Sequence, residues 1–161
     1  MNYQLQHKLQ RRIRLYIWVV IVGLFLSGVT AFPIETEVAI LINHPPIQSP
    51  AMAAWLNKVY QAVCTTNITY PFLGYGTDWL AFAHLMLAVL FIGPLNNPVK
   101  NIWVIEFGLI ASVAIFPLAF IAGGIRGIPF FWTMIDCSFG IITIALLLPC
   151  YNNIKKLGGL V

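Results

Sequence analysis

The sequence predicts an all-α integral membrane protein: a bundle of four transmembrane helices with both termini cytoplasmic and a short amphipathic helix outside. The 161-residue chain is 60% hydrophobic and 9% charged, with a mean hydropathy of +0.85, whereas soluble domains are about a quarter charged. Four apolar runs have, or nearly have, the roughly 20 residues that a helix needs to cross a bilayer. Most Lys and Arg residues flank the same side of these runs, which is a topology signal.

The first apolar run covers residues 15–32, after a basic segment at residues 1–14, and Pro33 ends it. The basic start, the apolar stretch and the small residues around Thr30 are also typical of a cleaved signal peptide. The apolar run is at the long end for a signal, so we expect a retained helix.

The second run covers residues 78–95 and is closed by Gly93-Pro94, and the third covers residues 102–122 and is closed by Gly123-Gly124. The fourth covers residues 129–149. Pro129 suits its first turn, because the missing N–H of proline would be unpaired there. Residues 150–161 form a cytoplasmic tail.

The basic residues predict the orientation. Seven of the nine lie on the side of the termini, and Lys58 and Arg126 lie on the other. The seven are Lys8, Arg11, Arg12, Arg14, Lys100, Lys155 and Lys156. Because cytoplasmic segments are enriched in Lys and Arg, we expect both termini to face the cytoplasm and residues 33–77 to face outward from the plasma (inner) membrane. The net charge of +4 therefore reflects topology, and we expect no nucleic-acid partner.

The outer segment, residues 33–77, contains a predicted amphipathic helix. Ser49 and Pro50 are typical of a helix start, with serine as the cap and proline in the first turn. Apolar side chains then recur at helical spacing. They are Met52, Trp55, Leu56, Val59, Tyr60 and Val63. We expect this helix to lie on the membrane or across the mouth of the bundle.

Two ionisable residues lie inside predicted spans at one depth. His84 is six residues into the second span and Asp136 is seven residues into the fourth, so each lies roughly 9–10 Å below the outer surface. Lipid offers a carboxylate no partner, so Asp136 should point into the bundle, on the same face as Thr133. A carboxylate that orients and charges an imidazole is a common functional pair. We therefore predict that His84 and Asp136 meet.

The remaining charged residues suggest how that site would be completed. Arg126, in a predicted Gly-Gly-Ile-Arg-Gly loop just above this layer, would hold an anion or pair with Asp78, Glu35 or Glu37. Asp78 equally suits the start of a helix, where a negative charge is favourable. Glu106, near the cytoplasmic start of the third span, is better explained by the helix dipole or by an ion pair than by catalysis.

Small residues within the spans are expected to be close-packing points rather than ligand contacts. They are Gly23, Ser27, Gly108 and Gly140. Cys64, Cys137 and Cys150 form no C-x-x-C pair, so the sequence offers neither a zinc knuckle nor a dithiol redox motif.

Two kinds of cofactor remain open from the sequence. A metal would be held by His84 and Asp136 with one of Glu35, Glu37 or Asp78, because carboxylate and imidazole suit zinc, iron or manganese. Haem would need His84 alone or His84 together with His44. No metal-ligand motif such as E-x-x-H supports either group.

Three functions fit these observations. The first is a binding or transport-type bundle with an outward-facing pocket, in which His84 and Asp136 bind a proton, a metal or a small ligand, with Arg126 above them. The second is an accessory subunit of a larger membrane complex or a homo-oligomer, in which the polar residues serve packing. The third is a membrane enzyme that acts on a lipid or quinone with His84 as general base, or a haem or metal redox protein.

Overall fold

The computed structural model describes residues 2–43 and 49–159, and every regular element in these ranges is a helix. The elements are α1 (Asn2–Ala31), α2 (Ile34–Asn43), α3 (Pro50–Thr69), the short 3-10 helix η1 (Pro71–Leu73), α4 (Gly74–Leu90), α5 (Ile92–Asn96), α6 (Ile102–Arg126) and α7 (Phe130–Gly158). Four stretches are long and apolar enough to cross a membrane, namely α1, η1 to α5, α6 and α7. The predicted all-helical class with four such helices is therefore confirmed.

The chain forms two compact units. Unit 1 contains residues 1–22 and 88–161, and unit 2 contains residues 23–87. The predicted outer segment, residues 33–77, lies entirely within unit 2, together with the end of α1 and most of α4.

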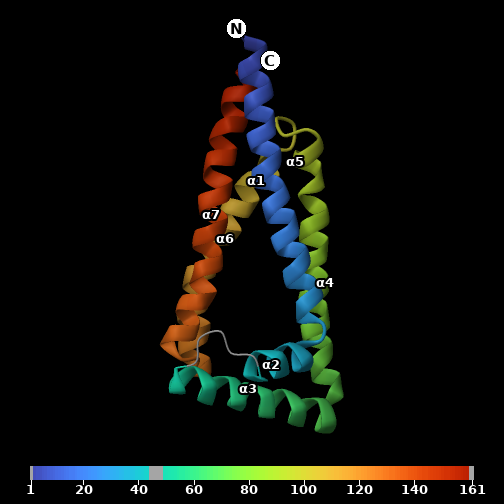
Figure 1. Ribbon diagram of the computed structural model, residues 1–161, viewed down its shortest axis with the longest axis vertical. Helices are drawn as coiled ribbons and strands as arrows, with labels where there is room; N and C mark the ends of the chain where they lie inside the picture. Colours follow the sequence, from blue (N-terminus) through green and yellow to red (C-terminus); the bar gives the residue numbers. More distant parts are fainter. Residues whose placement is uncertain (1, 44–48, 160–161) are drawn as a thin grey trace. The chain divides into compact units, whose positions relative to one another are not determined.

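Helices α6 and α7 form an antiparallel hairpin in unit 1 (Figure 1). The turn between them uses Gly127, whose φ of 66° is the left-handed conformation that favours glycine. The backbone N–H of Ile128 then donates to the carbonyl of Gly123 at 2.9 Å. The prediction that Gly123-Gly124 closes this helix was wrong, because α6 continues through both glycines to Arg126.

The two helices of the hairpin approach to backbone contact. A Cβ atom on Gly140 would lie 2.8 Å from the carbonyl oxygen of Ser112, and one on Gly108 would lie 2.6 Å from Leu147 Cδ1. The close-packing role predicted for Gly108 and Gly140 is thus confirmed. The same prediction for Gly23 was wrong, since a Cβ there would meet nothing within 4 Å.

The core of unit 1 combines side chains from both ends of the chain. Its fully buried members from α1, α6 and α7 include Ile13, Ile17, Ile105, Leu147 and Ile154. The thiol of Cys150 lies 3.9 Å from the carbonyl oxygen of Ile13, 137 residues away in sequence. The first half of α1 and the last half of α7 are therefore part of one packed core.

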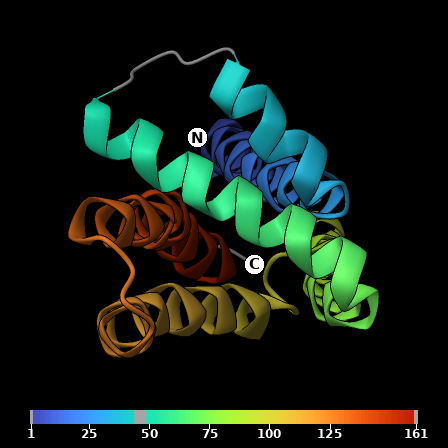
Figure 2. The ribbon, with the colours of Figure 1, turned by 90° about the horizontal axis from the view of Figure 1, so that it is seen from below.

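Unit 2 contains a helix, α2, that was not predicted from the sequence. Pro33 ends α1, and its carbonyl then accepts the N–H of Glu37 at 2.9 Å, which starts α2. Helices α2 and α3 lie side by side (Figure 2) and run crosswise to the end of α1 and to α4 (Figure 1). Gly28 lies against Ala81 and Leu85, because a Cβ on Gly28 would come within 3 Å of both. This contact joins α1 to α4.

The start of α3 agrees with its prediction. Ser49 is the N-cap, its hydroxyl accepts the N–H of Met52 at 3.2 Å, and Pro50 occupies the first turn. The span boundaries differ more. Helix α4 begins at Gly74 rather than Asp78, and α7 begins at Phe130, just after Pro129, and continues through Pro149 to Gly158.

Candidate functional site

A pocket in unit 2 brings together two of the acidic residues that the sequence singled out. The cavity has a volume of about 560 Å³ and is lined by the junction of α1 and α2, by the last turns of α3, and by η1 with the start of α4. Glu35 and Asp78 both line it. We refer to this cavity as the Glu35–Asp78 pocket.

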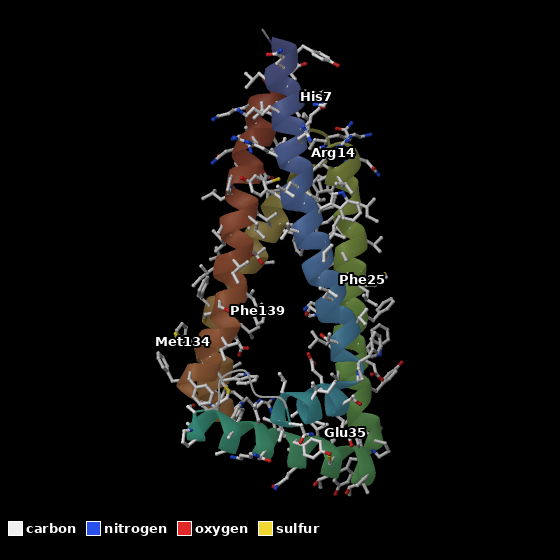
Figure 3. All side chains as sticks on the ribbon, in the orientation of Figure 1. His7, Arg14, Phe25, Glu35, Met134 and Phe139 are labelled. Carbon is white, nitrogen blue, oxygen red and sulfur yellow. The ribbon has the colours of Figure 1, made fainter. Side chains whose placement is uncertain are left out.

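Both oxygens of the Glu35 carboxylate have a donor from α3. Asn67 donates its side-chain N–H to Oε2 at 2.7 Å, and the Cys64 thiol lies 3.5 Å from Oε1. Figure 3 shows Glu35 at the level where α2 lies beside α3. These contacts fix the carboxylate in the wall of the pocket, and bonds to a charged acceptor are stronger than neutral ones.

Asp78 contributes the second carboxylate from α4. It is half-buried and is the fifth residue of that helix, so it lies beyond the first turn. The interpretation of Asp78 as the residue that opens the helix is therefore wrong. Its neighbour Thr77 also lines the pocket, as does Tyr75, three residues before Asp78. The polar lining of the pocket thus includes two acids, an amide and several hydroxyls.

The other residues that line the pocket are mainly apolar. They include Phe32, Val63 and Leu73, and Pro33 and Pro71 lie where the chain turns from α1 into α2 and from α3 toward α4. No Lys or Arg occurs among the described residues that line it. A cavity lined by both acidic and apolar residues suits a small molecule that has a positive group on a hydrocarbon body.

Tyr60 lies one turn before Cys64 on α3. A hydrogen bond with Cys64 is the main cause that raises the pKa of Tyr60 above its ordinary value, followed by the charge of Cys64, desolvation and the charge of Glu35. The sequence pattern predicts Tyr60 only as part of an apolar face, and neither Cys64 nor Asn67 is a predicted site residue. The spacing of these three residues, four and then three positions, is the signal that would have placed them on one helix face.

His84 lies deeper along α4 and is half-buried. Its Nδ1 is 2.8 Å from the carbonyl oxygen of Leu80. A carbonyl only accepts, so Nδ1 must carry the proton of this bond, and Nε2 is the ring atom that can gain or lose one. His84 belongs to unit 2 and Asp136 to unit 1, and their pairing stays a prediction.

The other predicted residues of unit 1 have separate surroundings. Asp136 is half-buried on α7, one turn after Thr133, which is buried with its hydroxyl 3.4 Å from the carbonyl of Pro129. Arg126 is exposed and is the last residue of α6, so its assignment to a loop was wrong. Glu106 is exposed, in the second turn of α6.

Glu37 differs from Glu35 although both are in the first turn of α2. It is half-buried and does not line the pocket. Within the described ranges, no three His, Cys, Asp or Glu side chains gather closely enough to hold a metal ion. His44, named for a haem, lies outside the described residues.

Comparison with known proteins gives no relative from which to transfer a function: no family model, no curated protein and no solved structure matches the chain.

Proposed function

We propose that the chain is a multi-pass protein of the plasma (inner) membrane that binds a small cationic ligand in the Glu35–Asp78 pocket. Both termini would be cytoplasmic and the pocket would open on the outer side, as the distribution of basic residues predicts. One observation carries the proposal: two carboxylates from distant parts of the chain line one cavity of about 560 Å³.

The chemistry of the pocket favours a protonated amine with a compact apolar body. The cavity volume falls within the roughly 300–1,000 Å³ range of ordinary ligand sites. Two carboxylates that line one cavity attract a positively charged group and disfavour a negatively charged one. The side chains of Phe32, Val63 and Leu73 would cover the hydrocarbon part of the ligand and exclude water from the charged contact.

His84 extends this proposal toward transport. It follows Thr77 of the pocket by seven residues, which is two helical turns, so the two residues share one side of α4 roughly 10 Å apart. A histidine changes charge near neutral pH. His84 would then accept a proton that enters through the pocket and couple ligand binding to proton movement.

The test measures ligand binding to the purified protein by calorimetry. A small primary amine is compared with the alcohol and the carboxylic acid of the same carbon skeleton. Charged hydrogen bonds contribute about 1.5–3 kcal/mol each, so Glu35→Gln and Asp78→Asn should each weaken amine binding by roughly tenfold to a hundredfold. Gln at position 35 retains a carbonyl oxygen for Asn67, which preserves the link between α2 and α3.

Glu37→Gln is the matched control, because it removes the same charge from the same helix turn but outside the pocket. Amine affinity should stay within about twofold of the unmodified protein, because Glu37 does not line the cavity and makes no direct contact with a ligand bound there. The proposal fails if the alcohol or the acid binds as tightly as the amine, or if all three variants weaken binding equally.

A further inference from the structure

The basic residues at the ends of α1 and α7 form a second surface, distinct from the pocket. Cys150 of α7 contacts Ile13 of α1 in the core of unit 1. The two helices run antiparallel there, so residues before Ile13 and residues after Cys150 continue toward the same end of unit 1 (Figure 1). We call the exposed cations at the level of this contact and toward this end the basic collar. They are Lys8, Arg11, Arg12, Arg14, Lys155 and Lys156.

The packing of unit 1 forces these cations outward. Leu9, Ile13 and Ile17 are buried on α1, and Ile154 and Leu157 are buried on α7, one residue before and one residue after the lysine pair. Buried and exposed positions therefore alternate with the helical period on both helices. The side chains of the collar are left on the outer faces.

The collar has no acidic counterpart on its own helices. Helix α1 contains no Asp or Glu, and α7 contains none after Asp136, five turns before its lysine pair. Lys155 lies 5.1 Å from the ring centre of Tyr151, which is a cation–π contact. Several of these cations lie three or four residues apart on one helix, where like charges repel one another, so the collar favours an anionic partner from outside the chain.

A shallow hollow on α1 is the candidate binding position for this anionic partner. It is lined by Tyr3, Gln4, His7, Lys8, Arg11 and Arg12. Figure 3 shows His7 and Arg14 projecting from the first half of this helix. Lys8, Arg11 and Arg12 stand at i, i+3 and i+4 and lie on one side of the helix. Arginine matches the geometry of phosphate with two parallel N–H groups.

The position of the basic collar relative to the predicted membrane spans indicates that the anion is a lipid headgroup. The predicted first span starts at residue 15 and the predicted fourth span ends at residue 149, so the contact between Ile13 and Cys150 marks the edge of the hydrocarbon region. Arg12 lies roughly 1.5 Å beyond Ile13, while Lys8 and Lys155 lie roughly 7.5 Å beyond the contact level. The headgroup layer is about 5–7 Å thick on each side of the bilayer, so the collar coincides with the lipid phosphates.

We propose that the basic collar is a binding site for the phosphate headgroups of anionic lipids in the cytoplasmic leaflet. The site rests on the membrane insertion proposed above and is independent of the Glu35–Asp78 pocket. Each Lys or Arg near an anionic surface contributes about 1 kcal/mol. Loss of two should lower the preference for anionic over neutral lipid by as much as thirtyfold.

The experiment reconstitutes the full chain in nanodiscs that contain a mixture of phosphatidylglycerol and phosphatidylcholine. The protein is then extracted in mild detergent, and the retained lipids are quantified by mass spectrometry. The unmodified protein should retain phosphatidylglycerol in excess over its share of the mixture. In the double variant with Arg11→Gln and Arg12→Gln, the phosphatidylglycerol enrichment should fall at least fivefold, which is within the thirtyfold limit given above. Arg11→Lys with Arg12→Lys, which keeps both charges, should retain most of it.

Lys58→Gln with Arg126→Gln is the control, because it removes two positive charges that the topology places on the opposite side of the membrane. Its enrichment should equal that of the unmodified protein. Equal losses in both double glutamine variants would show a general effect of charge and overturn the proposal. So would binding of soluble polyglutamate through Arg11 and Arg12 without any lipid enrichment, because the partner would then be an acidic protein segment.

The outcomes separate this proposal from the proposed function. A protein that stays in the nanodisc without lipid enrichment refutes the collar site and leaves the pocket untouched. A protein that does not stay in the nanodisc refutes membrane insertion and the collar site together. Amine binding is measured on a different surface with different variants, so its failure leaves the lipid result unaffected.

Discussion

Alanine at position 140 tests whether α6 and α7 meet at backbone contact. The added Cβ would lie 2.8 Å from the carbonyl oxygen of Ser112 and 3.4 Å from two ring carbons of Phe116. The Ser112 carbonyl belongs to a helix and cannot rotate alone, so the two helices must separate by several tenths of an ångström. Overpacking of this kind costs about 1–3 kcal/mol. Part of this cost is offset, because alanine is favoured over glycine inside a helix by about 1 kcal/mol.

Gly23→Ala isolates the steric part of the effect. Gly23 is also inside a helix, α1, but its Cβ would meet nothing within 4 Å. Both variants gain the same helix propensity, so Gly140→Ala should be less stable than Gly23→Ala by about 1–3 kcal/mol. Gly108→Ala should fall between them, because the atoms it meets at 2.6 and 3.0 Å belong to the side chains of Leu147 and Phe91, which can move.

The assay is reversible unfolding in mixed micelles with increasing dodecyl sulfate, followed by circular dichroism. Free energies of unfolding are compared between variants in the same detergent mixture, so effects of the micelle cancel. Equal stability of Gly140→Ala and Gly23→Ala would refute the reasoning, because it would mean that α6 and α7 do not approach closely at Gly140.

Two further predictions concern α3. Ser49→Ala removes the hydroxyl that accepts the N–H of Met52 and should destabilise the start of the helix by about 1 kcal/mol; faster hydrogen exchange at Met52 checks this, and unchanged exchange would contradict it. Cys64→Ala should lower the pKa of Tyr60, which the hydrogen bond with Cys64 raises. That bond stabilises the folded state below the ordinary tyrosine pKa, and its contribution is lost as the pH rises through the raised value. Ultraviolet titration of the tyrosinate band measures the midpoint, and an unshifted midpoint would disprove the coupling.

The sequence was informative where structure depends on neighbouring residues. The four apolar runs predict four long helices because hydropathy accumulates along a continuous segment. Ser49 and Pro50 predict the start of α3 because capping is a local interaction. The ends of the helices were less predictable. Gly123 and Gly124 are often helix terminators, yet the left-handed position falls at Gly127, where the turn into α7 requires it.

The pocket depended on contacts that no local pattern specifies. Glu35 was named from the sequence as a charge that Arg126 would pair with, but its donor is Asn67, 32 residues later. This contact requires α2 to fold beside α3. From the sequence, Pro33 predicts only the end of a helix and not the start of α2. Asp78 reaches the same cavity because α4 starts one turn before it. The sequence thus named both acids of the pocket and missed the helix that brings them together.

The contact between Ile13 and Cys150 has a consequence for how the protein is made. Cys150 is synthesised 137 residues after Ile13, so the stripe of Leu9, Ile13 and Ile17 cannot reach its final neighbours until α7 has been made. Until then the stripe must be covered by lipid or by an insertion factor. Unit 1 can therefore close only after α7 has been synthesised, whereas unit 2, whose residues all precede α7, can assemble earlier.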